Sequence, residues 1–172
     1  MDHLTNRILS SCIVAVSLGA GSSVQSATAK PESNSLVGTW RLVSYVDTPE
    51  DDVPIHAFGM EPIGLFIFTP DGHVSISIMR NPPDITAPTT DPDPDACIPA
   101  WYCAYFGTYT VNYHEGAWVT HVLGGNIPSY VGTDQKRSFT IRGDRLLISE
   151  TYRAGDQTVH AERVLIREAN TR

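Results

Sequence analysis

Four residues in the C-terminal half of the chain have side chains suited to acid–base chemistry on a small organic molecule: Tyr109, His121, Arg137 and Glu150. An imidazole titrates near neutral pH, so it serves as a general acid or base, and a neighbouring phenol orients it. A guanidinium held by a carboxylate stabilises an oxyanion such as an enolate. Brought together, the four would suit isomerisation or cyclisation of an apolar substrate.

Short β-strands separated by turns must position these side chains, and no segment has a long amphipathic helical period. Consecutive hairpins without long crossovers predict an all-β fold, an up-and-down antiparallel β-barrel of about eight strands, because closure removes exposed strand edges. One long Pro/Asp-rich loop, residues 80–104, interrupts the pattern and is typical of a binding loop. The predicted strands are 36–46, 63–68, 73–79, 105–113, 117–124, 136–141, 145–152 and 158–168.

The turn at Gly143-Asp144 predicts which residues of its hairpin share a face. A two-residue turn with Gly first suits this pair, and it sets Arg137 opposite Glu150. Such an inward pair has two further interpretations besides catalysis. It is either a structural ion pair, since internal pairs also occur without function, or the polar part of a mostly apolar ligand cavity.

The turn that contains Gly116 predicts the position of His121. A type I turn with Gly116 in the left-handed region sets Tyr109 opposite His121 and Val111 opposite Val119, all facing inward. A slip of one residue would reverse these faces. Treating the three hairpins alike gives a predicted set of ligand-binding residues: Phe66, Phe68, Ile76, Ile78, Val111, Val119, Phe139 and Ile148.

The N-terminus has the features of a secretory signal peptide. An early basic residue, a short apolar run and small residues at Ala27 and Ala29 predict residues 1–29 as the signal and residues 30–172 as one domain. An uncleaved anchor is the alternative. After signal removal, the sequence contains no second apolar segment that would predict a membrane span. We therefore expect a secreted or periplasmic protein.

The overall charge and the available side chains limit the possible partners. The chain has a net charge of -7 and its basic residues are scattered, which argues against nucleic acid as a partner. No H-E-x-x-H motif or other zinc-ligand spacing is present, so we predict no metal and no cofactor. The oligomeric state is not indicated.

Two cysteines remain after removal of the signal, Cys97 and Cys103. In an exported protein such a pair most readily forms a disulfide, here one that closes a short loop. Free thiols or a metal site are the alternatives.

Several motifs resemble one family along nearly the whole mature chain. They are Gly38-Thr39-Trp40, Phe68-Thr69-Pro70-Asp71-Gly72, Tyr105-Phe106-Gly107-Thr108-Tyr109, Val119-Thr120-His121 and the stretch from Gly124 to Phe139. In order and spacing, the chain is similar to the lipocalin-like domain proteins of bacteria and fungi. The resemblance implies a calycin-type barrel with an internal cavity, in which Trp40 packs at the closed end beneath Arg163 or Arg167.

The resemblance leaves function open between two classes, since lipocalin-like folds carry hydrophobic ligands and some barrel relatives are cyclases or isomerases. Our first hypothesis is a secreted barrel that binds a small hydrophobic molecule. The alternative is a cyclase or isomerase of secondary metabolism that uses the four residues named first. A barrel filled by its own side chains, with a structural or interaction role, is the third.

Overall fold

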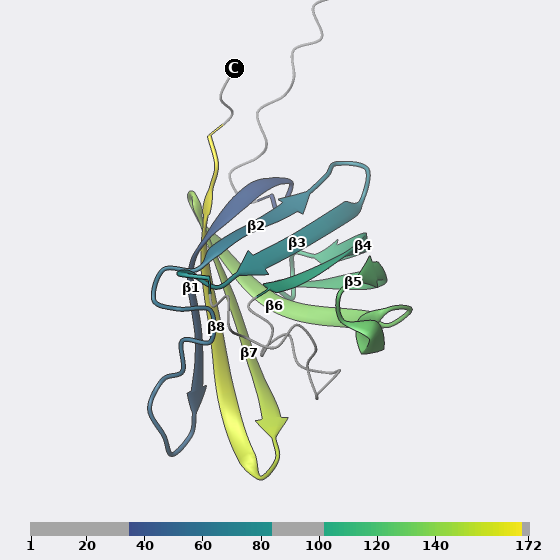
Figure 1. Cartoon of the computed structure of the whole chain (residues 1–172). Coiled ribbons are helices and arrows are strands. Elements are labelled where there is room, and N and C mark those ends of the chain that lie inside the picture. Colours follow the sequence, from purple (N-terminus) through teal and green to yellow (C-terminus); the bar gives the residue numbers. More distant parts are fainter. Residues whose placement is uncertain (1–34, 84–101, 170–172) are drawn as a thin grey trace, which may run out of the picture. The chain divides into compact units, whose positions relative to one another are not determined.

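A computed structural model describes residues 35–83 and 102–169, and within them the chain forms a closed antiparallel barrel of eight strands in sequence order (Figure 1). This confirms the predicted all-β up-and-down architecture. The elements are β1 (Gly38–Pro49), β2 (Ile63–Phe68), β3 (His73–Met79), β4 (Tyr102–Asn112), β5 (Ala117–Gly125), the 3-10 turn η1 (Pro128–Tyr130), β6 (Asp134–Arg142), β7 (Arg145–Ala154) and β8 (Gln157–Arg167). Within the described ranges, no helix is long and apolar enough to cross a bilayer.

Strand β8 pairs with β1 and so closes the barrel. The pairing shifts register between Leu42 and Ser44, which leaves Val43 as an extra residue in β1. A bulge of this kind reverses the side-chain alternation that follows it. Tyr45 and Asp47 therefore face the interior, where both are almost completely buried.

The predicted faces of two hairpins are confirmed. In the β2–β3 hairpin, Phe66 pairs with Ile76 and both are buried. In the β6–β7 hairpin, Gly143-Asp144 forms the expected two-residue turn between Arg142 and Arg145. Gly143 takes a φ of 63°, a conformation that glycine adopts without steric cost.

The predicted register of the β4–β5 hairpin is wrong by one residue. Asn112 pairs with Ala117, so four residues form the turn in place of three. The Asn112 side chain stabilises this longer turn, because its Oδ1 accepts hydrogen bonds from the backbone N–H groups of His114 and Glu115. The resulting register also buries the large indole of Trp118.

This register moves two predicted site residues, His121 and Val119, to the outer surface. Tyr109 lies opposite Thr120, and His121 lies opposite Thr108. Val119 alternates with the buried Trp118, so it too faces outward. The prediction that His121 and Val119 point into the barrel is therefore incorrect.

Trp40 fills the closed end of the barrel, the end at which the turn Gly143-Asp144 lies. Its ring is fully buried, and its Nε1 donates to the carbonyl of Leu36 at 2.8 Å. The Arg167 guanidinium covers the ring with Cζ 4.0 Å from the ring centroid, and its Nη1 donates to the carbonyl of Val37 at 2.7 Å. Arg167 is thus the basic residue that the family resemblance implied above Trp40.

Strands β6 and β7 separate toward the opposite end, which we call the cavity end. Their ladder stops at the pair Ser138–Ser149. Beyond it, β6 pairs only with β5, and the remainder of β7 pairs only with β8. The two ribbons run apart in Figure 1.

We expect Arg167→Met to lower the free energy of unfolding by about 2–3 kcal/mol, because it removes a cation–π contact and hydrogen bonds to the carbonyls of Ser35 and Val37. Arg41→Met is the matched control. It removes one exposed ion pair, with Glu168, and should cost about 0–1 kcal/mol. Urea denaturation measures both, and equal losses would contradict the role given to Arg167.

Candidate functional site

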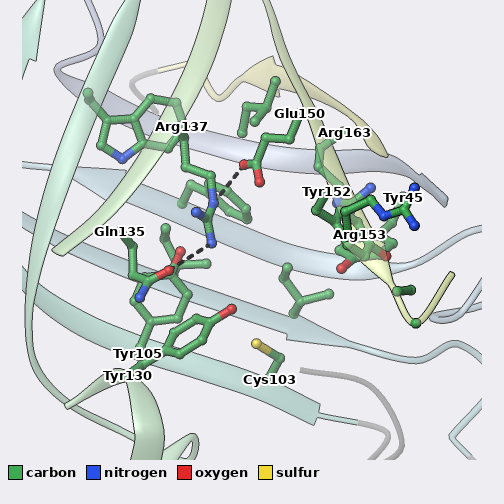
Figure 2. A pocket seen from close by; sticks show the side chains of 17 residues that line it. Tyr45, Cys103, Tyr105, Tyr130, Gln135, Arg137, Glu150, Tyr152, Arg153 and Arg163 are labelled. Carbon is green, nitrogen blue, oxygen red and sulfur yellow. Dashed lines mark hydrogen bonds and ion pairs between the residues drawn. The ribbon is translucent and has the colours of Figure 1, made fainter. Parts of the chain in front are cut away.

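A cavity of about 720 Å³ lies inside the barrel at the cavity end. It reaches the surface at the β7–β8 turn, where the lining residues Arg153, Ala154 and Gly155 are exposed. Figure 2 shows the side chains around it. The lining residues are Tyr45, Phe66, Ile76, Ile78, Cys103, Tyr105, Trp118, Tyr130, Gln135, Arg137, Ile148, Glu150, Tyr152, Arg153, Ala154, Gly155 and Arg163.

One side of the cavity is apolar. Of the eight predicted ligand-binding residues, four line it: Phe66, Ile76, Ile78 and Ile148. All four are buried; Phe66, Ile76 and Ile78 form one wall on the neighbouring strands β2 and β3, whereas Ile148 on β7 pairs with Arg163. This wall offers an apolar molecule the kind of environment that ligand pockets generally provide.

Packed aromatic side chains bound the cavity on the side of the closed end. Trp118 lines the cavity and packs on Phe68 and Phe139, with ring centroids 5.5 Å and 5.7 Å away. Val111 packs against the same core. Three of the predicted ligand-binding residues therefore pack behind Trp118 and do not line the cavity: Phe68, Phe139 and Val111.

An ion pair crosses the point where β6 and β7 separate. Arg137 Nε lies 2.7 Å from Glu150 Oε1, and both side chains are mostly buried, with exposed fractions of 20% and 28%. Figure 2 shows Arg137 between Glu150 and Gln135, which accepts from Nη2 at 3.5 Å. The predicted inward pairing of Arg137 with Glu150 is confirmed.

Burial shifts the protonation of this pair. It raises the pKa of Glu150 above its usual value, and the attraction of the Arg137 cation offsets that shift only in part. For Arg137, burial alone would lower the pKa, but Tyr105 and Glu150 outweigh it and the pKa is raised. Arg137 therefore stays cationic, while Glu150 takes up a proton more readily than an exposed glutamate.

Two tyrosines lie beside Arg137. Tyr105 on β4 and Tyr130 on η1 pack edge to face, with ring centroids 5.7 Å apart. Burial raises the pKa of Tyr105 to about 12 against the opposing effect of Arg137. Its hydroxyl is therefore neutral at physiological pH and remains a hydrogen-bond donor.

A second ion pair joins β8 to β1. Arg163 Nη2 lies 2.8 Å from Asp47 Oδ1, and the side chains are 13% and 4% exposed. This approach is not aligned for a hydrogen bond, so the contact is ionic. Arg163 also donates to the carbonyl of Val46 at 2.8 Å and stacks on Tyr45 with Cζ 3.3 Å from the ring centroid. Burial raises the pKa of Tyr45, which stays protonated.

The structure does not assemble the four predicted catalytic residues. His121 does not line the cavity; its side chain is 52% exposed and its Nδ1 lies 2.9 Å from Asp134 Oδ1 on the outer face. Tyr109 donates its hydroxyl to the carbonyl of Thr69 at 3.0 Å, toward the closed end. Only Arg137 and Glu150 lie together on the cavity wall.

Several polar lining residues were missed by the sequence analysis. Tyr45 depends on the β1 bulge, which simple alternation does not reveal. Tyr130 depends on the short turn η1, whose Pro128 was the only local signal. The sequence predicts Arg163 only as a possible cover for Trp40, because it does not define the inward face of β8. Gln135 follows from the Arg137 alternation and could have been inferred from it.

The residues that could hold a metal do not cluster in the described segments, where no group of three such side chains meets. Cys103 is fully buried on β4 and lines the cavity. Cys97 lies outside the described residues, so the Cys97–Cys103 disulfide stays a prediction.

Comparison with known proteins assigns the family. Residues 37–168 match the family model described as a lipocalin-like domain. The match covers most of the chain, and the chain belongs to this lipocalin-like domain family. No curated protein and no solved structure matched it.

We expect the stability difference between Glu150→Gln and wild type to depend on pH. Because the pKa of Glu150 is raised on folding, its protonation stabilises the fold. That contribution is complete below the pKa of the unfolded chain and is lost as the pH rises through the folded pKa. The glutamine does not ionise, so the free energy of unfolding of Glu150→Gln should rise relative to that of the wild type between about pH 3 and pH 7.

Urea denaturation across this pH range measures the effect. Glu162→Gln, on the exposed outer face of β8, serves as the control for removing a carboxylate from the surface. A shift in favour of wild type as the pH rises would mean that the attraction of Arg137 outweighs burial.

Proposed function

We propose that this protein binds one small, largely apolar molecule in its barrel cavity. The observation that carries the proposal is a cavity of about 720 Å³ with an apolar wall on one side and a few polar groups, Arg137 and Glu150 among them, on the other. Membership of the lipocalin-like domain family supports it. Binding pockets for small molecules generally combine these two kinds of surface.

We favour binding over the cyclase or isomerase hypothesis because of the position of His121. The histidine assigned as the acid–base group lies on the outer face, bonded to Asp134. The remaining pair, Arg137 and Glu150, suits the anchoring of a polar group on a ligand without any turnover.

A neutral fluorescent probe tests the binding proposal. We expect N-phenyl-1-naphthylamine to bind saturably with one site per chain. Ile78→Trp should weaken its binding by at least about tenfold, because the larger ring occupies the cavity. Ile67→Trp, on the exposed face of β2, should leave binding unchanged. Thermal melts of both variants confirm folding, and absence of saturable binding to the wild type would overturn the proposal.

We propose further that the protein is exported and carries the Cys97–Cys103 disulfide. The apolar N-terminal run followed by small residues supports export, and the spacing of the cysteines supports the bridge. The intact mass of protein recovered from its exporting host should match a chain that begins after Ala27 or Ala29, and reduction should raise it by about 2 Da. Retention of Met1 would contradict export with signal removal, and an unchanged mass on reduction would contradict the disulfide.

A further inference from the structure

The charge of the cavity is opposite to the charge of the protein. The chain carries 12 basic and 19 acidic residues, for a net charge of -7. In the part of the chain that the structure describes, the cavity is lined by three arginines, Arg137, Arg153 and Arg163, and by one carboxylate, Glu150. An excess of cations on a concave wall of an acidic protein indicates a site for an anion.

Two of the arginines already have carboxylate partners. Arg163 is held by Asp47, and it also contacts the carbonyls of Val46 and Glu162 and the ring of Tyr45. Arg137 shares its Nε with Glu150. Among the described residues, three guanidinium groups thus meet two carboxylates, which leaves one positive charge for a ligand to neutralise.

The surroundings of Arg137 suit an anion better than those of Arg163. Arg137 gives Nε to Glu150 and Nη1 to the carbonyl of Lys136, while Nη2 makes a long contact with Gln135, and the hydroxyls of Tyr105 and Tyr130 also interact with the guanidinium. A guanidinium carries five N–H donors in a planar fork that matches a carboxylate. Its Nη2 contacts Gln135 only at 3.5 Å, and the hydroxyls of Tyr105 and Tyr130 lie in the same part of the wall, as Figure 2 shows, where they can also donate to an anion.

Arg153 contributes at the exposed end of the cavity. It donates to Thr158 Oγ1 and to the carbonyl of Asp156, two acceptors without charge. Its charge therefore adds to the attraction for an anion near the β7–β8 turn. Because it is exposed, its effect on bound ligand is weaker than that of the mostly buried Arg137.

From these observations we propose that the ligand is an apolar monocarboxylate, bound with its body against Phe66, Ile76 and Ile78 and its carboxylate on Arg137. This inference rests on the proposed binding function and names the chemical class of its ligand. Glu150 competes with that carboxylate for the same guanidinium. Removing the charge of Glu150 therefore strengthens anion binding, in contrast to its effect on a neutral ligand.

Two probes that differ by one sulfonate test the inference. N-phenyl-1-naphthylamine is neutral, and 8-anilinonaphthalene-1-sulfonate is the same molecule with an anionic group. Fluorescence titration gives the ratio of anionic to neutral affinity for each variant. We expect Glu150→Gln to raise this ratio about tenfold, and the double variant Arg137→Gln/Glu150→Gln to lower it again by at least about tenfold.

Two further variants locate the effect. Arg142→Gln removes the same charge from the exposed β6–β7 turn and should leave the ratio unchanged. Arg153→Gln should lower the ratio by less than about threefold, in keeping with an exposed charge. Loss of the preference in Arg153→Gln alone would place the anion at the β7–β8 turn and overturn the assignment to Arg137.

Displacement of the neutral probe tests the carboxylate itself. Decanoate should compete at least about tenfold better than 1-decanol on the wild type, and equally well on the double variant. A ratio that is the same in every variant, or equal competition by the acid and the alcohol on the wild type, would overturn the inference while binding of the neutral probe persists. Failure of the neutral probe itself to bind overturns the proposed function instead.

Discussion

The interior of this protein exists because β8 pairs with β1. That ladder gives the outermost strands partners and turns a series of hairpins into a closed surface with an inside. The bulge between Leu42 and Ser44 then changes which residues of β1 face inward. It delivers Tyr45 and Asp47 to the cavity end while Trp40 and Leu42 remain in the closed end. One extra residue thus separates the packed part of β1 from its polar part.

The two ends of the barrel use arginine in different ways. At the closed end, Arg167 lies over Trp40 and satisfies carbonyls of the N-terminal segment, so its contacts hold the chain in place. At the cavity end, Arg163 is fixed by Asp47 and Tyr45. Arg137 differs from both, because it lies where the β6–β7 ladder ends and has cavity beside it in place of packed side chains.

Burying the Arg137–Glu150 ion pair has an electrostatic cost. A mostly buried ion pair gains little net stability, since desolvation offsets the attraction of the two charges. The raised pKa of Glu150 is the direct expression of that cost. Retaining two ionic groups on a wall that hydrophobic residues could fill is consistent with a role in recognising a polar group on a ligand.

The strand order, the turns of two hairpins and the apolar wall could be predicted from the sequence, because alternation and turn chemistry are local properties. The Gly143-Asp144 turn is sufficient to set Arg137 opposite Glu150. His121 shows the limit of this reasoning, since the Asn112 side chain stabilises a turn that is one residue longer and so reverses the side chains of β5.

The site as a whole was decided only by the tertiary structure. Tyr45, Tyr130 and Arg163 reach the cavity from a bulge, a short 3-10 turn and the closing strand, three features that depend on contacts between distant segments. The sequence by itself determined the barrel and its central ion pair, since hydrophobic alternation and glycine turns act over a few residues. Closure decided which further polar groups surround that pair, because their directions follow from strand pairing across the whole chain.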